Sequence, residues 1–414
     1  MSKRMAHKSM ALMSAVLMQA ACSEDGRDPA ELEPPPSVSH QSVATSLSDF
    51  FIIGADGQRA STFAAWKARG INTMVRWNQN DSCANFDNTA IANGLKAIRV
   101  TGHPSSPTPS EDAGKAHLIA TAQDDEPEMG YPNYTVGRAA VQADNDADNA
   151  AGKPFFSNHA GPWIRNDVNG VHPNDYCGIR GQVYNQWCYG EYFAAADWIG
   201  FDLYPKNSNI DINSIEQVIK LIQGTGTTQP ILAYIEASDF DCLGGYPNQW
   251  HITYQSVLAV IAGAKGVIYF PHKLGPTSNG SCATPTADGT TLETQNELTW
   301  LHAAYRAIPP TTLNGTRNPT GVTFESGTTT GQIRWGTRKD ATHAYYLTLN
   351  DHDSTAYNHV VRFHGINNCT NKAVTVYEAG TSATRTVTLN SSCVTTTSEG
   401  WSARRWKIYK VPVN

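Results

Sequence analysis

Eight short runs rich in Ile, Val, Phe and Tyr alternate along the chain with stretches that have the apolar spacing of helices. This alternation predicts repeated strand–helix units around a parallel sheet. The candidate strands cover residues 50–54, 71–77, 95–100, 117–123, 153–159, 198–205, 230–237 and 265–272. No phosphate-binding glycine fingerprint follows the first strand, so the pattern favours a closed (β/α)8 barrel, or TIM barrel, over an open doubly wound sheet. Residues 101–116, between the third and fourth strands, have room for a short helix at most.

The pattern changes near residue 308. A turn-rich link is followed by runs in which apolar and polar residues alternate, which is typical of a small antiparallel β-sandwich with one face buried. We therefore place the barrel at residues 49–308 and the sandwich at residues 309–414. We expect the sandwich to cap and stabilise the barrel rather than to act as a separate binding module.

The N-terminus has the features of an export signal. Residues 1–8 are basic, and a short apolar run from Met10 leads to Cys22, so residues 1–22 read as a secretory signal. Cys22 resembles the acylated lipobox cysteine of bacterial lipoproteins, although Gln19 stands where that motif usually has Leu. Lipidation at Cys22 and ordinary signal cleavage both stay open. The Pro-rich residues 23–48 are expected to be a flexible tether.

The charge balance bears on possible partners. The chain has 31 Lys and Arg against 37 Asp and Glu, a net charge of -6, and no basic block, so a nucleic acid partner is not expected. Outside the N-terminal signal no stretch is apolar for the ~20 residues that a membrane helix needs, so membrane contact is expected only through a lipid anchor. These features predict an exported protein, either anchored to the bacterial cell envelope or secreted.

Eight cysteines in an exported chain argue for disulfides. The expected pairs, with Cys83 left over, are Cys177 with Cys188, Cys242 with Cys282, and Cys369 with Cys393. A zinc site is the competing idea, but no C-x-x-C or H-x-x-x-H spacing occurs among these residues. No metal and no organic cofactor are therefore expected.

Two glutamates stand at the ends of apolar, strand-like runs. Glu126 follows LIATA within the acidic segment 124–128, and Glu236 follows ILAYI. Parallel barrels build their sites at this end of the strands, and two carboxyls facing each other suit the cleavage of a glycosidic bond. The alternatives are a solvated acidic loop or a calcium site at Glu126, and a structural salt bridge at Glu236.

An acid followed by Pro on the fourth strand, with a Glu on the seventh, resembles the clan of retaining glycoside hydrolases that have a (β/α)8 barrel. The resemblance covers roughly the barrel. It implies that Glu126 is the acid/base and Glu236 the nucleophile, ~5 Å apart. It also implies that Arg76 holds the nucleophile ionised and that Tyr204 lies beside it. The clan usually has Asn before the acid/base, where it binds the 2-hydroxyl of the sugar, and here that position is Asp125.

Other residues at predicted strand ends are candidate substrate contacts: Trp77, His159, Trp163 and His272. Each could instead be structural. The expected function is an exported retaining glycosidase that cleaves a β-linked oligo- or polysaccharide. The alternatives are a surface glycan-binding lipoprotein without turnover, and an inverting hydrolase with carboxyls ~6.5 to 9.5 Å apart.

Overall fold

The computed structural model describes residues 47–76, 81–100, 108–127, 134–161, 187–207, 209–238, 247–271, 290–318, 321–325, 333–352 and 354–414. Side chains are not described at residues 123, 124, 134, 135, 187 and 188. The predicted export signal with Cys22 and nearly all of the predicted tether lie outside these ranges, as do Trp77, Trp163 and His272.

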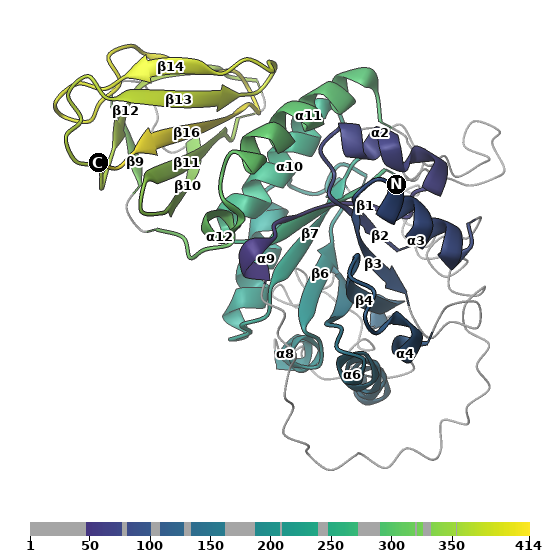
Figure 1. The fold of residues 1–414 in the computed structure, drawn as a ribbon. Coiled ribbons are helices and arrows are strands. Elements are labelled where there is room, and N and C mark those ends of the chain that lie inside the picture. The colour runs from purple at the N-terminus through teal and green to yellow at the C-terminus, as the bar shows by residue number, and fades with distance from the viewer. Residues whose placement is uncertain are drawn as a thin grey trace, which may run out of the picture.

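Eight parallel strands close into a barrel in which each strand pairs with the next one along the chain, and β8 pairs with β1 (Figure 1). The predicted (β/α)8 fold is confirmed. The strands are β1 (Ile52–Asp56), β2 (Thr73–Val75), β3 (Lys96–Val100), β4 (Leu118–Asp125), β5 (Phe155–Ala160), β6 (Trp198–Asp202), β7 (Ile231–Glu236) and β8 (Gly266–Phe270).

Alternation along each strand decides which side chains face the barrel interior. On β7, Leu232 and Tyr234 belong to the inner apolar cluster, whereas Ala233 and Ile235 pack with the surrounding helices. Because successive residues of a strand point to opposite faces, Glu236 shares the inner face with Tyr234. The same rule places Asp56, two residues after Gly54 and four after the inner Ile52, on the inner face of β1.

Helices surround the barrel, and several have sequence-encoded ends. The Asn248 side chain caps α10 by accepting from the backbone N–H groups of Trp250 and His251, both at 3.0 Å. Gly263 ends this helix with φ of 119°, a conformation that favours glycine. The helices are η2 (Leu47–Asp49), η3 (Ala60–Thr62), α2 (Phe63–Ala68), α3 (Cys83–Ala92), α4 (Pro109–Asp112), α6 (Tyr134–Ala150), α8 (Trp187–Ala194), α9 (Ser214–Gly224), α10 (Gln249–Ala262), α11 (Leu292–Arg306) and α12 (Pro310–Leu313).

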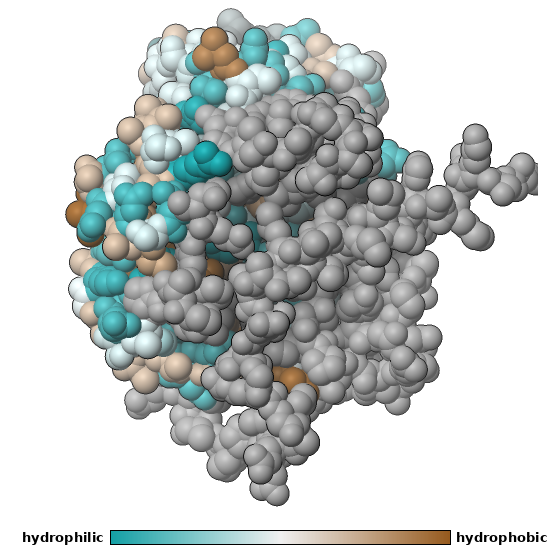
Figure 2. Space-filling view, turned by 90° about the vertical axis from the view of Figure 1, so that its right-hand side faces the viewer, coloured by the Kyte–Doolittle hydropathy of each residue, from teal (hydrophilic) through white to brown (hydrophobic). Residues whose placement is uncertain are grey.

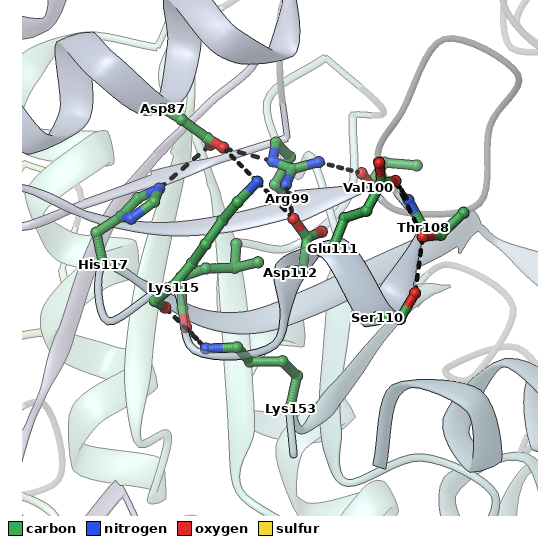
Figure 3. A network of polar contacts seen from close by, with 11 residues as sticks. Asp87, Arg99, Val100, Thr108, Ser110, Glu111, Asp112, Lys115, His117 and Lys153 are labelled. Carbon is green, nitrogen blue, oxygen red and sulfur yellow. Dashed lines mark hydrogen bonds and ion pairs between the residues drawn. The ribbon is translucent and has the colours of Figure 1, made fainter. Parts of the chain in front are cut away.

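A buried ionic network lies against β3 beside α4, the four-residue helix in the described part of the connection to β4 (Figure 3). Arg99, which is fully buried, donates from Nε to Asp87 at 3.1 Å and from Nη2 to Asp112 at 2.5 Å. Lys115 Nζ also contacts both aspartates, and His117 contacts Asp87. Charged side chains thus cover this part of β3, and the buried Arg99 is paired with both Asp87 and Asp112.

Replacing Asp112 with Ala is expected to lower the free energy of unfolding by about 3 kcal/mol, because it leaves Arg99 with one of its two buried carboxylate partners. The change can be measured by urea unfolding followed by circular dichroism. Lys220→Ala is the matched control, since Lys220 is 61% exposed and pairs with Glu216 on the surface. That control should lose less than about 1 kcal/mol, and equal losses in both variants would contradict the argument.

The C-terminal strands form two antiparallel sheets that pack face to face. One sheet has the order β10-β11-β16-β13-β14 and the other β15-β12-β9. Side chains from both sheets, including Phe324, Tyr346 and Val361, share one core, which agrees with the predicted β-sandwich. The strands are β9 (Val322–Glu325), β10 (Ile333–Lys339), β11 (His343–Asn350), β12 (Tyr357–Phe363), β13 (Ala373–Glu378), β14 (Arg385–Thr388), β15 (Glu399–Trp401) and β16 (Trp406–Pro412).

One of the predicted disulfides lies in the sandwich, where Cys369 is bonded to Cys393. This prediction is confirmed. Cys177, Cys242 and Cys282 lie outside the described residues, and Cys188 is described in its backbone alone, so the other two pairs stay predictions. Cys83 is buried at the first position of α3.

The sandwich lies beside α10, α11 and α12 of the barrel (Figure 1). The buried Arg338 of β10 donates from Nη2 to the carbonyl oxygen of Val260 on α10 at 2.8 Å. Tyr254, also on α10, donates to Asp351 at 2.5 Å, and Gly336 approaches α10 so closely that an added Cβ would lie 3.2 Å from Ile261 Cα. The two parts are therefore packed against each other by specific polar and close backbone contacts.

Hydrophilic residues predominate among the coloured atoms on the face shown in Figure 2, and the strongly hydrophobic ones there are scattered. Among the described residues, the large apolar side chains that are exposed are Ile91 and Leu292. Within the same residues, no helix has both the length and the hydropathy required of a membrane span.

Candidate active site

The structure brings both candidate glutamates to the same rim of the barrel. Glu236 is the last residue of β7, and Glu126 directly follows β4. Because all eight strands are parallel, the C-terminal ends of β4 and β7 open onto one face. Functional residues of this fold are found on that face.

Glu236 is held by backbone and side-chain N–H groups of the segment after β6. Its Oε2 accepts from the Lys206 N–H at 2.9 Å, and its Oε1 accepts from the Asn207 N–H at 2.7 Å and from Asn207 Nδ2. Among the described residues it has no ion-pair partner, so the salt-bridge alternative is not what the structure contains. Oε2 accepts one hydrogen bond and Oε1 two, which leaves Oε2 the freer oxygen.

Burial dominates the titration of this carboxyl. The side chain is 1% exposed, and burial raises the pKa of Glu236 to about 7, while the N–H groups of Asn207 and Lys206 limit the increase. Donors aimed at both oxygens favour the ionised form, whereas the low-polarity surroundings favour the protonated one. Glu236 therefore changes its charge near neutral pH.

Glu126 has an unusual backbone. Its φ is 51°, in the left-handed region that a residue other than Gly, Asn or Asp seldom adopts. Its N–H donates to the carbonyl oxygen of Asn158 on β5 at 2.9 Å, and its side chain is half-buried. Arg76, after β2, has φ of 50°, so two candidate residues adopt this conformation at the same rim. Strained backbone of this kind is concentrated at functional sites.

Arg76 is placed differently from its predicted role. Its guanidinium forms ion pairs with Asp56, at 2.8 Å from Nε, and with Asp125, from Nη1. The resemblance implied a contact with the nucleophile, but Glu236 takes its hydrogen bonds from Lys206 and Asn207. Arg76 has a different role because two aspartates, at the ends of β1 and β4, bind different nitrogens of its guanidinium group.

Asp125 and Tyr204 both lie at the rim. Asp125 Oδ1 accepts from Asn158 Nδ2 at 2.9 Å, and the side chain is 43% exposed, so it remains accessible. The Tyr204 ring packs on Phe270 at the end of β8, with 5.2 Å between ring centroids. Burial and the nearby Asp202 and Asp125 raise the pKa of Tyr204. Contacts of these two residues with a substrate stay predictions.

His159 is not at the rim, and the prediction of a substrate contact for it is wrong. Strand alternation on β5 points Asn158 toward the barrel interior and His159 toward α8. The fully buried His159 ring packs against Tyr192 and Phe193, with centroid distances of 5.7 and 5.2 Å. The predicted contacts Trp77, Trp163 and His272 lie outside the described residues.

Sequence reasoning missed four residues that shape the rim: Asp56, Lys206, Asn207 and Tyr234. Asp56 and Tyr234 follow inner-face residues at a spacing of two, so the alternation carried a signal for them. Lys206 and Asn207 contribute backbone N–H groups, and no side-chain motif reveals those.

Among the described residues no three His, Cys, Asp or Glu side chains are grouped so that they could hold a metal ion.

No family model and no curated protein matches this sequence. The fold, however, is similar to that of many solved structures. Eubacterium rectale Amy13B is 10% identical with a TM-score of 0.52, and the match covers 91% of this chain and 99% of that one. CelM2, a bifunctional glucanase-xylanase from a metagenome library, is 9% identical with a TM-score of 0.51 over 88% and 96% of the two chains.

A Paenibacillus polymyxa xyloglucanase from glycoside hydrolase family 44, solved with xyloglucan, is 10% identical with a TM-score of 0.51, again over 88% and 96%. At these identities the likeness is one of fold, and it extends across the barrel and the C-terminal sheets. The fold and the rim together define a (β/α)8-barrel protein with carboxylates at the C-terminal ends of β4 and β7.

Proposed function

We propose that this protein is a retaining glycoside hydrolase that cleaves a β-linked oligo- or polysaccharide. The observation that carries the proposal is the pair of carboxyls at one rim, Glu126 after β4 and Glu236 at the end of β7. Glycosidic cleavage requires a proton donor and a nucleophile from two such groups. The glucanase-xylanase and the xyloglucanase with this fold act on polysaccharides by their names, which agrees with a glycan substrate.

In the proposed reaction Glu126 protonates the departing glycosidic oxygen while Glu236 Oε2 attacks the anomeric carbon. The bond to the leaving group breaks as the bond to Oε2 forms, giving a covalent glycosyl-enzyme. Glu126, now ionised, removes a proton from water, which attacks the same carbon and releases Glu236. The N–H groups of Lys206 and Asn207 stabilise the carboxylate that departs in this second step.

The proposal includes export. Residues 1–22 have the composition of a secretory signal, and Cys22 is a candidate for lipidation. Mass spectrometry of the mature N-terminus separates an acylated Cys22 from ordinary cleavage.

The function is tested by incubating the purified protein with plant, algal and bacterial polysaccharides and following the release of reducing ends. Product is expected with the wild type and with Glu293→Ala, a control that removes an exposed glutamate on α11, but not with Glu126→Ala. Binding of a glycan without product in every case, unchanged by Glu236→Gln, would favour the non-catalytic alternative.

The dependence of the rate on pH is expected to have an acidic limb near pH 7, because Glu236 must be ionised to attack and its pKa is raised to about 7. Asn207→Ala removes the side-chain donor to Oε1, which raises this pKa further and moves the limb upward. The shift should be roughly one pH unit, since a hydrogen bond to a charged group is worth ~1.5 kcal/mol. The measurement is kcat/KM against pH, and a limb that stays in place or moves to lower pH would contradict the assignment.

A further inference from the structure

Asp56 is a buried carboxylate at the end of β1, and the reaction proposed above does not use it. The residue is 2% exposed. Its Oδ2 accepts from Arg76 Nε at 2.8 Å and from the Tyr234 hydroxyl at 2.9 Å. A carboxylate removed from water and bonded by a cation and a hydroxyl is held in one orientation, and it holds its donors in return.

Arg76 links Asp56 to a second carboxylate on the other side of the rim. The guanidinium binds Asp56 through Nε and Asp125 through Nη1, so its planar fork bridges the ends of β1 and β4. The same group lies 5.7 Å from the centroid of the Tyr234 ring. The backbone N–H of Arg76 donates to the Ile98 carbonyl oxygen on β3 at 2.7 Å, which fixes the base of the side chain.

The other end of the bridge is next to the proposed acid/base. Asp125 directly precedes Glu126 and also accepts from Asn158 Nδ2 at 2.9 Å, while the Glu126 N–H donates to the carbonyl oxygen of the same asparagine at 2.9 Å. In the barrel, β1 and β4 are separated by β2 and β3, so ladder hydrogen bonds do not join them directly. The two strands are joined at their ends by the side chain of Arg76, which pairs with Asp56 and Asp125.

We infer that Asp56 is a positioning residue for Glu126, acting through Arg76 and Asp125 to hold the end of β4 in the conformation that aims the acid/base at the leaving group. The inference rests on the proposed function. Misplacing a reacting group by about 1 Å can lower a rate on the order of 10²-fold, so a residue two contacts away can have a measurable effect.

Asp56→Asn removes the charge and keeps the shape. The guanidinium then has one ionised partner, Asp125, instead of two, and the orientation of the Glu126 segment is less restricted. We expect kcat/KM to fall roughly 10- to 100-fold on a glycoside with a poor leaving group. On an aryl glycoside with a good leaving group, which needs little protonation, the fall should be less than about threefold. Asp146→Asn, an exposed aspartate on α6, is the matched control and should be unchanged.

A double-mutant cycle separates positioning from a merely structural effect. In a Glu126→Ala background there is no acid/base left to position, so Asp56→Asn should add less than about a twofold loss. A structural weakening would lower the rate by the same factor in both backgrounds. If Asp56→Asn does not fold, Arg76→Lys is used in the same cycle, because lysine keeps the charge but lacks the fork that bridges two carboxylates.

The outcomes distinguish this inference from the function on which it rests. Equal losses with and without Glu126, or equal losses on good and poor leaving groups, overturn the role of Asp56 while leaving the glycosidase intact. A Glu126→Ala variant as active as the wild type overturns the function instead. A loss confined to the background with Glu126, and larger for poor leaving groups, supports the inference.

Discussion

Glu236→Gln is expected to lower kcat on the order of 10⁴-fold or more on whichever glycan the wild type cleaves. A glutamine amide has the shape of the carboxylate but cannot form the glycosyl ester. The fold should survive, because the glutamine oxygen can still accept from the Asn207 N–H groups, although one N–H of the segment after β6 then faces an amide nitrogen. Kinetics with thermal unfolding in parallel measure both effects.

A companion variant tests the covalent step directly. In Glu236→Ala, a small anion such as azide can enter the vacated volume and attack the anomeric carbon, so added azide should restore glycosyl transfer with inverted configuration. Proton NMR of the first product should show retention for the wild type. Inversion by the wild type would rule out the double displacement, and a Glu236→Gln variant with more than a tenth of wild-type activity would exclude this residue as nucleophile.

Glu126→Ala is expected to have an effect that depends on the leaving group. Natural glycans need the departing oxygen to be protonated, so the loss in kcat/KM should be about 10²- to 10⁴-fold. The phenolate of an aryl glycoside with an acidic phenol leaves without that proton, so the glycosylation step should be nearly unaffected. The glycosyl-enzyme should then accumulate, because no base activates the water that would hydrolyse it.

The accumulation can be followed by mass spectrometry of the intact protein. Glu293→Ala serves again as the control for loss of a glutamate. The same fractional loss on every leaving group would contradict the acid/base assignment, because that result indicates a general disturbance of the site rather than missing proton transfer.

The fold could be predicted from the sequence because burial on both faces of a parallel strand leaves a continuous apolar run, and eight such runs were visible. The sequence also indicated a short helix at most between β3 and β4, but it did not reveal the ionic network that lies against β3. Arg99 and Asp112 are separated by 13 positions, and only the folded chain shows that they form a buried ion pair.

Positions at the rim were predictable where a side chain lies at the end of its strand. The placement of Glu126 and Glu236 at the rim was predicted in this way, and their catalytic roles stay predictions. The rim position expected for His159 was off by one residue, because a single step along a strand reverses the direction of the side chain. The contacts of Arg76 could not be predicted, since Asp56 and Asp125 come from strands that are not adjacent to each other in the barrel. The Lys206 contact with Glu236 could not be predicted either, because it is made by the backbone N–H, which nearly every residue type has.

Helix α10 has a consequence for how this protein could be altered or could have evolved. One side of it packs on β7, and the Gln255 side chain accepts from the Glu236 N–H at 3.4 Å. Its opposite side receives Arg338 from the sandwich. The C-terminal part is therefore not an interchangeable accessory module: grafting another in its place would strip a donor from the Val260 carbonyl and uncover the helix that supports the rim carboxylate. A chimera in which a different domain is joined after α11 should also leave α10 uncovered, unless the new domain provides contacts for that helix.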